Sequence, residues 1–196
     1  MQHAHTRTPT VPDGFAHPHR NVAVLGVEPG MKVADFGAGS GAYVLAIAEA
    51  LGGSGTVYAI DIQKDLLRRI KSEATRRDFH SVEVIWSDLE IPGSSKIADG
   101  ILDLVLISNL LFQLGDTHAP LCEAKRILKP NGRLAIIDWS ESFGGLGPRR
   151  DDVLKKEQAV ALAEGAGFDV VREFAAGAHH YGLLFGAHKA KSARKS

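Results

Sequence analysis

Short apolar runs alternate with longer amphipathic stretches along most of the chain, which is the pattern of strands that alternate with helices. Seven of the runs are predicted to be strands: 31–36, 56–60, 82–86, 102–107, 133–137, 168–174 and 181–187. The run at 102–107 is apolar along its whole length, as expected for a strand that is covered on both faces. The sequence therefore predicts a sheet whose centre is buried.

Helices are predicted between these strands, at 41–51, 63–77, 116–128 and 153–164. Leu66, Leu67 and Ile70 share one face of the second of these helices. A turn at Asn131–Gly132 is expected to lead into the fifth strand. The alternation predicts five successive βα-type units before the last two strands.

The connection between the last two strands is too short for a crossover helix, so these strands must be antiparallel. The other strands are expected to be parallel, with right-handed crossovers. The predicted fold is α/β: a three-layer, doubly wound, seven-stranded sheet, mostly parallel with an antiparallel terminal hairpin. We expect one domain over residues 1–196, with a flexible N-terminal segment at 1–16 and a flexible tail at 189–196.

Charge and composition narrow the function classes. The formal net charge is zero, which argues against a generally basic nucleic-acid surface but leaves a local patch open. The only cysteine, Cys122, lies in a helical segment and is expected to be a buried structural thiol. No apolar run resembles a signal peptide or a membrane span. The sequence predicts a cytoplasmic protein without membrane contact.

A glycine-rich loop with the sequence Gly37-Ala38-Gly39-Ser40-Gly41 follows the first predicted strand and opens a helix. Glycines allow a ligand to approach the backbone, and the start of a helix offers free N–H groups to an anion. Gly37, Gly39 and Ala42 also satisfy a dinucleotide-binding pattern. Asp35 argues against that alternative, because its charge would repel a pyrophosphate and suits a cofactor that carries an ammonium group.

Acidic residues also end the second and third strands. Asp61 can accept hydrogen bonds from both hydroxyls of a ribose. Asp88 can accept one from the amino group of adenine, with Ile62 and Leu89 on either side of the ring. Each aspartate alone can instead be a helix N-cap. Acidic residues at three successive strand ends favour a nucleoside ligand.

These motifs resemble the class I, Rossmann-like S-adenosylmethionine-dependent methyltransferases, closest to the ubiquinone/menaquinone-biosynthesis type. The matching stretches are 33–41, 57–61, 87–88, 102–109 and 127–134, and the resemblance covers roughly residues 20–188. It implies S-adenosyl-L-methionine as cofactor and methyl transfer as activity. It implies a cofactor site formed by Asp35, Gly37, Ala38, Gly39, Gly41, Asp61, Ile62, Ser87, Asp88, Leu89, Ser108 and Asn109.

The resemblance leaves the acceptor open. Leu110-Leu111-Phe112 follows Asn109, where some amino-methylating branches carry a Pro-Pro-Tyr motif. We expect a small-molecule acceptor. An RNA or protein methyltransferase, a non-catalytic cofactor-binding module and an NAD-dependent oxidoreductase are the alternatives. The sequence does not predict the oligomeric state.

Candidate catalytic residues lie at the same predicted edge of the sheet: His180, Asn109, Asp138, His179 and Tyr181. The two histidines can act as a base or orient a substrate, because imidazole titrates near neutral pH. They can also form an ordinary polar turn, and no third ligand supports a metal site with Asp138. Trp139 and Phe143 are expected either to form an aromatic wall or to pack under the loop. The resemblance also implies that the segment 15–25, with His17 and His19, is a candidate lid over the site.

Overall fold

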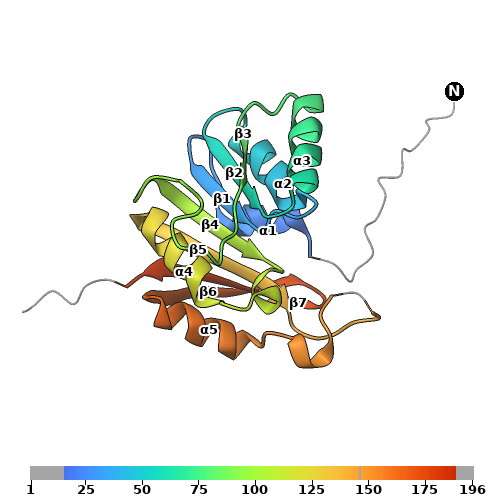
Figure 1. Cartoon of the computed structure of the whole chain (residues 1–196), viewed down its shortest axis with the longest axis vertical. Helices are drawn as coiled ribbons and strands as arrows, with labels where there is room; N and C mark the ends of the chain where they lie inside the picture. The colour runs from blue at the N-terminus through green and yellow to red at the C-terminus, as the bar shows by residue number, and fades with distance from the viewer. Residues whose placement is uncertain (1–15, 146, 189–196) are drawn as a thin grey trace, which may run out of the picture.

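The computed structural model describes residues 16–145 and 147–188. The segments expected to be flexible, 1–16 and 189–196, lie outside this part except for Ala16, and so does Phe15 of the candidate lid. Within the described part, seven strands form one sheet in the order β3-β2-β1-β4-β5-β7-β6 (Figure 1). The strands are β1 (Lys32–Phe36), β2 (Thr56–Asp61), β3 (Val82–Trp86), β4 (Leu102–Ser108), β5 (Leu128–Trp139), β6 (Phe168–Gly177) and β7 (His180–Ala187).

The pairing of the strands confirms the predicted fold class. The first five strands are parallel to one another, whereas β7 runs antiparallel to both β5 and β6. β6 is therefore parallel to the main sheet, and its carboxyl end lies at the same edge as those of β1, β2 and β4. In doubly wound sheets this edge carries the ligand site.

Helices cover both faces of the sheet and give three layers. They are α1 (Pro18–Leu25), α2 (Ala42–Leu51), α3 (Lys64–Arg76), α4 (His118–Ile127) and α5 (Lys156–Gly165). Alternate residues of each strand point to opposite faces. Val33 and Leu104 thus pack with α1, α2 and α3 in one cluster, and Ala34 and Val105 pack with α4 and α5 in another.

Three elements differ from the sequence prediction. The predicted turn at Asn131–Gly132 lies inside β5. Leu128 already pairs with Leu102, and the register then shifts, so that Leu104 pairs with Arg133 and residues 129–132 form the irregular part of the strand. A side chain at Gly132 would come within 2.9 Å of the Leu102 carbonyl oxygen, so glycine is needed for the strands to approach. α5 begins at Lys156 rather than at residue 153, and the candidate lid contains α1.

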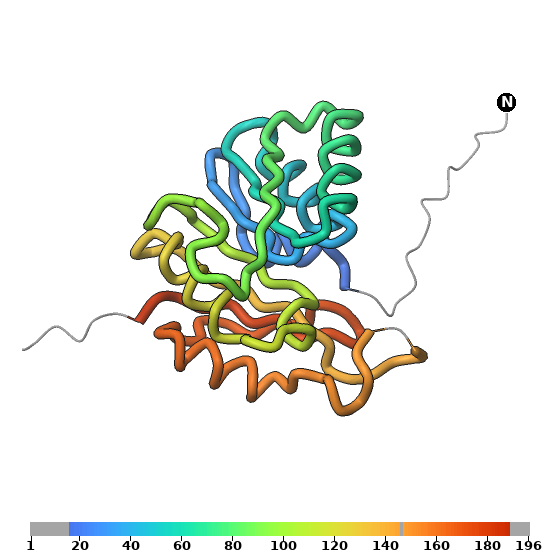
Figure 2. Tube along the Cα trace, viewed as in Figure 1, coloured from blue at the N-terminus to red at the C-terminus, as the bar shows by residue number. Residues whose placement is uncertain are grey.

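The connection from β3 to β4 carries no helix, so the prediction of five βα units was wrong at this point (Figure 2). Side chains from α4 hold the connection instead. Buried Glu123 accepts a hydrogen bond from the Gly93 N–H at 3.2 Å and pairs with Arg126 at 2.7 Å. Arg126 in turn donates to the Ile97 carbonyl oxygen at 2.8 Å. The expectation for Cys122 was also wrong, because this thiol is exposed.

Candidate functional site

Two adjoining cavities lie at the carboxyl edge of the sheet. The first cavity, of about 360 Å³, lies between the glycine turn, the ends of β4 and β5, and the start of α1. The second cavity, of about 320 Å³, lies against the ends of β2 and β3. Both are lined by Gly37, Gly39, Asn109 and Gln113, so together they can hold one extended ligand.

The three glycines of the turn, Gly37, Gly39 and Gly41, have different roles. All three have positive φ, and a side chain at Gly37 or Gly41 would collide with Leu110 or Ile70, respectively. A side chain at Gly39 would meet only the Gly37 carbonyl oxygen, at 3.7 Å, and Gly39 lines both cavities. Gly39 therefore leaves room for a ligand. Gly41, which lines neither cavity, serves packing.

Asp61, at the end of β2, holds this turn in place by hydrogen bonds. Its two carboxylate oxygens accept hydrogen bonds from the backbone N–H groups of Gly39, at 2.9 Å, and Gln63, at 2.8 Å. The N-cap residue of α3 is Gln63, so the alternative that Asp61 is the N-cap is wrong. Each oxygen keeps a further lone pair for a ligand that enters the second cavity.

The end of β3 forms the far wall of the second cavity. Ser87, Asp88 and Leu89 line it together with Ile62. One Asp88 oxygen accepts a hydrogen bond from the Glu90 N–H at 3.0 Å. No helix follows Asp88 before β4, so the N-cap alternative is wrong here as well. The apolar side chains of Ile62 and Leu89 beside the carboxylate of Asp88 suit a flat polar ring.

Asp35 lies under the first cavity with its side chain almost fully buried. Its Oδ1 atom has no hydrogen-bond partner among the described residues. Burial, reinforced by the negative charge of Asp61, raises the pKa of the Asp35 carboxyl to about 8. A buried carboxyl group without a partner is costly and fits a cationic group of a bound ligand.

Asn109, directly after β4, lines both cavities. Its φ of 52° is in the left-handed region, where asparagine is among the residues tolerated best. Its buried Oδ1 atom has no partner among the described residues, and its carbonyl oxygen accepts a hydrogen bond from the Gln113 side chain. Ser108 lines the first cavity but not the second. Asn109 thus presents an unused acceptor where the cavities join.

His180 and Trp139 close the first cavity at its other end. They pair across β5 and β7, so both point to the same face of the sheet, with ring centres 4.2 Å apart. Neither ring nitrogen of His180 has a hydrogen-bond partner within the described part of the chain. Burial, reinforced by nearby His179, lowers the pKa of His180 to about 4, so the ring is neutral at physiological pH.

The remaining catalytic candidates lie elsewhere. Asp138 and Tyr181 form the neighbouring pair of the same ladder, so they point to the opposite face. The Tyr181 hydroxyl donates to the Leu154 carbonyl oxygen at 3.0 Å, and Asp138 accepts from the Trp139 N–H. His179 contacts Glu141 at 2.6 Å and stacks on Phe143. These two contacts of His179 hold the loop that follows β5. None of the three candidates Asp138, His179 and Tyr181 lines the first cavity.

Sequence reasoning missed Tyr43 and Gln113, which line the first cavity. Four further lining residues lie in segments that it did single out, although it assigned none of them a role in the site: Ser40 and Ala42 in the glycine-rich motif, and Ala16 and Pro18 in the candidate lid. Of the two missed residues, Tyr43 is the more informative, because it is the second residue of α2 and follows the glycine turn directly. An aromatic hydroxyl at the start of a helix that faces the ligand edge was the available signal. The position of Pro18 at the cavity depends on the placement of α1, which no strong apolar pattern predicted.

Charge is distributed unevenly around the cavities. Asp35, Asp61, Asp88 and Glu90 line them, and none of the described residues that line either cavity is Lys or Arg. No three His, Cys, Asp or Glu side chains of the described residues gather closely enough to hold a metal ion. The described helices include none with the length and hydropathy of a membrane span.

A doubly wound sheet with acidic strand ends around a glycine turn defines a nucleoside-binding domain of the Rossmann-like class. Residues 27–186 match the methyltransferase domain family, and the chain belongs to this family. A crystal structure of an S-adenosylmethionine-dependent methyltransferase from Aquifex aeolicus is similar, with 29% identity and a TM-score of 0.78, over 87% of this chain and 89% of that one. The predicted family and its cofactor, S-adenosylmethionine, are confirmed.

Two curated relatives match the expected branch of the family. Demethylmenaquinone methyltransferase of Listeria monocytogenes is 32% identical over 119 residues, which is 60% of this chain and 48% of that protein. Ubiquinone/menaquinone biosynthesis C-methyltransferase UbiE of Burkholderia cenocepacia is 28% identical over 125 residues, 64% of this chain and 50% of that protein. The chain thus spans about half the length of the curated relatives it matches.

Proposed function

We propose that this chain transfers a methyl group from S-adenosylmethionine to a small-molecule acceptor, as one methyltransferase domain in the cytoplasm. The observation that carries the proposal is the set of acidic strand ends, Asp35, Asp61 and Asp88, around two cavities that share Gly39. The unpartnered buried atoms of Asp35 and Asn109 fit this cofactor, since it offers an ammonium group and hydroxyl donors.

The chain's own residues bind the cofactor along both cavities. Asp61 receives the ribose hydroxyls, and Asp88 receives the adenine amino group between Ile62 and Leu89. Asp35 faces the ammonium group beside the glycine turn. Bound there, S-adenosylmethionine supplies a methyl group on a sulfonium, so the protein does not have to activate the leaving group. The protein has to align the acceptor and exclude water.

His180 and Trp139 supply this alignment at the end of the first cavity. A neutral imidazole can accept a hydrogen bond from an O–H or N–H group of the acceptor with one nitrogen and donate with the other. Its lowered pKa makes it a weak base, so His180 orients the nucleophile rather than holding its proton for long. The ring of Trp139 limits the cavity on one side and keeps water out.

A small acceptor fits the charge of the cavities better than a nucleic acid does, because no Lys or Arg is among their described lining residues. Residues 64–77 carry six basic and two acidic residues, but none of these charged residues lines either cavity. Three of the six basic side chains form ion pairs within the same segment, Arg68 with Asp65, and Arg76 and Arg77 with Glu73. The quinone-pathway names of the curated relatives support an apolar ring as acceptor.

Calorimetry with S-adenosylmethionine tests the cofactor, and label transfer from methyl-labelled cofactor to extracted small molecules tests the activity. In His180→Ala we expect turnover to fall about tenfold or more, as for a lost hydrogen bond in the transition state, with cofactor affinity nearly unchanged. His80→Ala, at an exposed loop position, is the matched control. Equal losses of turnover and affinity in His180→Ala would contradict the role of His180, and label found only in RNA or protein would contradict the small acceptor.

A further inference from the structure

Asn21 is the only polar residue on the buried face of α1. This face consists of Asn21, Val22 and Leu25, and the Asn21 side chain is fully buried. A buried amide costs free energy unless it is hydrogen-bonded. The Asn21 amide group therefore needs hydrogen-bond partners inside the protein.

The Asn21 amide joins three elements, of which α1 and α2 line the first cavity. Its Nδ2 atom donates to the Tyr43 hydroxyl oxygen on α2, at 2.8 Å, and to the Ala176 carbonyl oxygen on β6, at 2.9 Å. Ala176 is the unpaired residue of a bulge, because the register with β7 shifts between Ala175 and Gly177. The bulge leaves the Ala176 carbonyl free to face α1.

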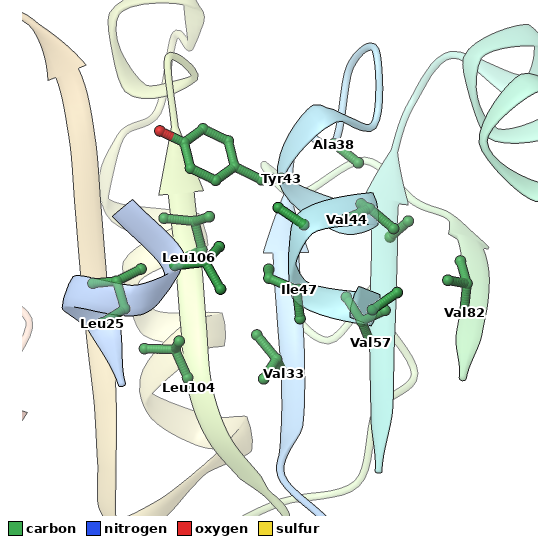
Figure 3. Packing of buried hydrophobic residues seen from close by; sticks show 14 of the residues in the cluster. Leu25, Val33, Ala38, Tyr43, Val44, Ile47, Val57, Val82, Leu104 and Leu106 are labelled. Atoms are coloured by element: carbon green, nitrogen blue, oxygen red, sulfur yellow. The ribbon is translucent and has the colours of Figure 1, made fainter. Parts of the chain in front are cut away.

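These two bonds fix the direction of the Tyr43 hydroxyl. A backbone carbonyl only accepts, so the NH₂ end of the Asn21 amide must face Ala176, and the same NH₂ group then donates to Tyr43. The Tyr43 oxygen is thus used as an acceptor, and its hydrogen must point to another partner. In Figure 3 the Tyr43 ring lies above Leu106, with the hydroxyl directed away from α2.

Tyr43 is consequently available as a donor in the first cavity, which it lines together with neighbouring Ser108. Burial raises the pKa of Tyr43 to about 12, and the charge of nearby Asp35 acts in the same direction. The hydroxyl therefore keeps its proton at physiological pH. No Lys or Arg is among the described residues that line this cavity, so an anionic group there depends on neutral donors such as Tyr43.

We propose that Tyr43, held by Asn21, binds the carboxylate at the amino-acid end of the cofactor. This inference rests on the proposed function. In an amino acid the ammonium and carboxylate groups share one carbon atom, so a ligand whose ammonium faces Asp35 brings its carboxylate within reach of a donor beside Asp35. Asn21 is a positioning residue, since it lines neither cavity and acts through Tyr43.

The test compares S-adenosylmethionine with its decarboxylated analogue, which keeps the sulfonium and the ammonium and lacks only the carboxylate. In Tyr43→Phe, calorimetry should show about tenfold weaker binding of S-adenosylmethionine, as for a hydrogen bond to a charged group. The affinity for the analogue should not change. Tyr58→Phe, on β2 outside both cavities, is the matched control.

Asn21→Asp keeps the shape of the side chain but removes both N–H donors, so Tyr43 would donate to the new carboxylate instead of to the ligand. We expect the same selective loss as in Tyr43→Phe, and no further selective loss in the double variant. Thermal unfolding checks that each variant is folded, and Tyr43→Phe decides alone if Asn21→Asp is not.

Equal loss for both ligands, or no loss for either, in Tyr43→Phe would overturn the carboxylate assignment and leave the proposed function standing. Unchanged binding of S-adenosylmethionine to folded Asn21→Asp would overturn the role of Asn21. A wild-type protein that binds neither ligand would overturn the proposed function, and the inference would fall with it.

Discussion

Asp35 and Asp61 end neighbouring strands and differ in their bonding. Asp61 already accepts two backbone hydrogen bonds, whereas the Oδ1 atom of Asp35 has no partner among the described residues. Backbone N–H donors stabilise a carboxylate, and burial without donors favours the neutral acid. The two side chains therefore differ in what a ligand meets: backbone donors hold the Asp61 oxygens in place, whereas a bound cationic group favours ionisation of Asp35.

Replacing Asp61 tests the ribose assignment. Asp61→Ala should weaken binding of S-adenosylmethionine by about 1–3 kcal/mol, because charge-assisted hydrogen bonds to the ligand are lost and the Gly39 N–H loses its acceptor. Calorimetry measures the change. Asp65→Ala, at an exposed position on α3, is the control. Unchanged affinity in Asp61→Ala would rule out a contact with the ribose.

The pH dependence of cofactor affinity tests Asp35. Below about pH 8 the free protein carries a neutral Asp35, and a bound ammonium group favours the ionised form. Binding should release a proton, and affinity should rise with pH between about pH 6 and about pH 7.5, below the ordinary pKa of an α-amino group. Calorimetry in buffers of different ionisation enthalpy measures the proton release. In Asp35→Asn the release should disappear, and its persistence would contradict the assignment.

The same shift affects stability. The folded protein holds a proton on Asp35 that the unfolded chain loses above its ordinary pKa of 3.8. The contribution of Asp35 is thus fully present below that pKa and is lost as pH rises through about 8. Asp35→Asn should lose less stability than the wild type as the pH is raised across this window, as followed by thermal unfolding.

At the scale of single residues, the sequence predicted which residues lie at the strand ends better than it predicted the direction of their side chains. The three aspartates lie at strand ends as expected, because strand ends follow from the apolar runs. Among His179, His180 and Tyr181, however, only the strand register decides which side chain faces the cavity. A shift of one residue would exchange His180 for Tyr181, and neither composition nor spacing fixes that shift.

At the scale of elements, the turn from β1 to α2 combines two requirements in one short segment. Gly41 is packed against Ile70, and Gly39 faces the space shared by both cavities. Both have positive φ, so alanine at either position carries the cost of a left-handed backbone. Only at Gly41 does a collision with a buried side chain add to this cost.

Two alanine variants separate these requirements. Gly41→Ala should lower the free energy of unfolding by about 2 kcal/mol or more, because strain and overlap add. Gly39→Ala should cost about 1 kcal/mol in stability and weaken cofactor binding roughly tenfold, since its methyl group enters the ligand space. Denaturant unfolding and calorimetry measure the two effects. The reverse ranking in stability would show that the packing assignment is wrong.

Elements that follow a strong apolar period were predicted well from the sequence, and elements held by tertiary contacts were not. β3 was predicted to the residue because its apolar residues, interrupted only by Glu83, are bounded by Ser81 and Ser87. α1 has only eight residues and no side-chain cap, so it depends on packing against α2 and on its bonds to Ala176. The connection before β4 was missed because Glu123 and Arg126, far along the chain, replace a helix there.

At the scale of the whole molecule, charge is balanced overall and unbalanced at the ligand edge. The net charge is zero, yet the described lining of the two cavities carries four acidic residues, of which Asp35 is neutral below about pH 8 in the free protein, and no Lys or Arg. Low-dielectric walls concentrate the potential of such a cleft. The cleft should therefore favour the cationic cofactor over the uncharged thioether that remains after methyl transfer.

Ionic strength tests this imbalance. Between about 0.05 M and about 0.5 M salt, binding of S-adenosylmethionine should weaken several-fold, because screening shortens the reach of the carboxylates. Binding of S-adenosylhomocysteine, which lacks the sulfonium charge, should change less. Calorimetry at both salt concentrations provides the comparison. Equal salt dependence of the two ligands would contradict a steering role for the acidic cleft.

The bond from Asn21 on α1 to Ala176 connects residues separated by 155 positions. During translation the glycine turn, Asp35 and Asp61 leave the ribosome soon after Asn21, and well before the bulge that anchors α1 and before His180. A nascent chain can thus fold the β1–β2 part of the site before β6 and β7 are available, and the proposed methyl transfer has to wait until both of these strands have emerged.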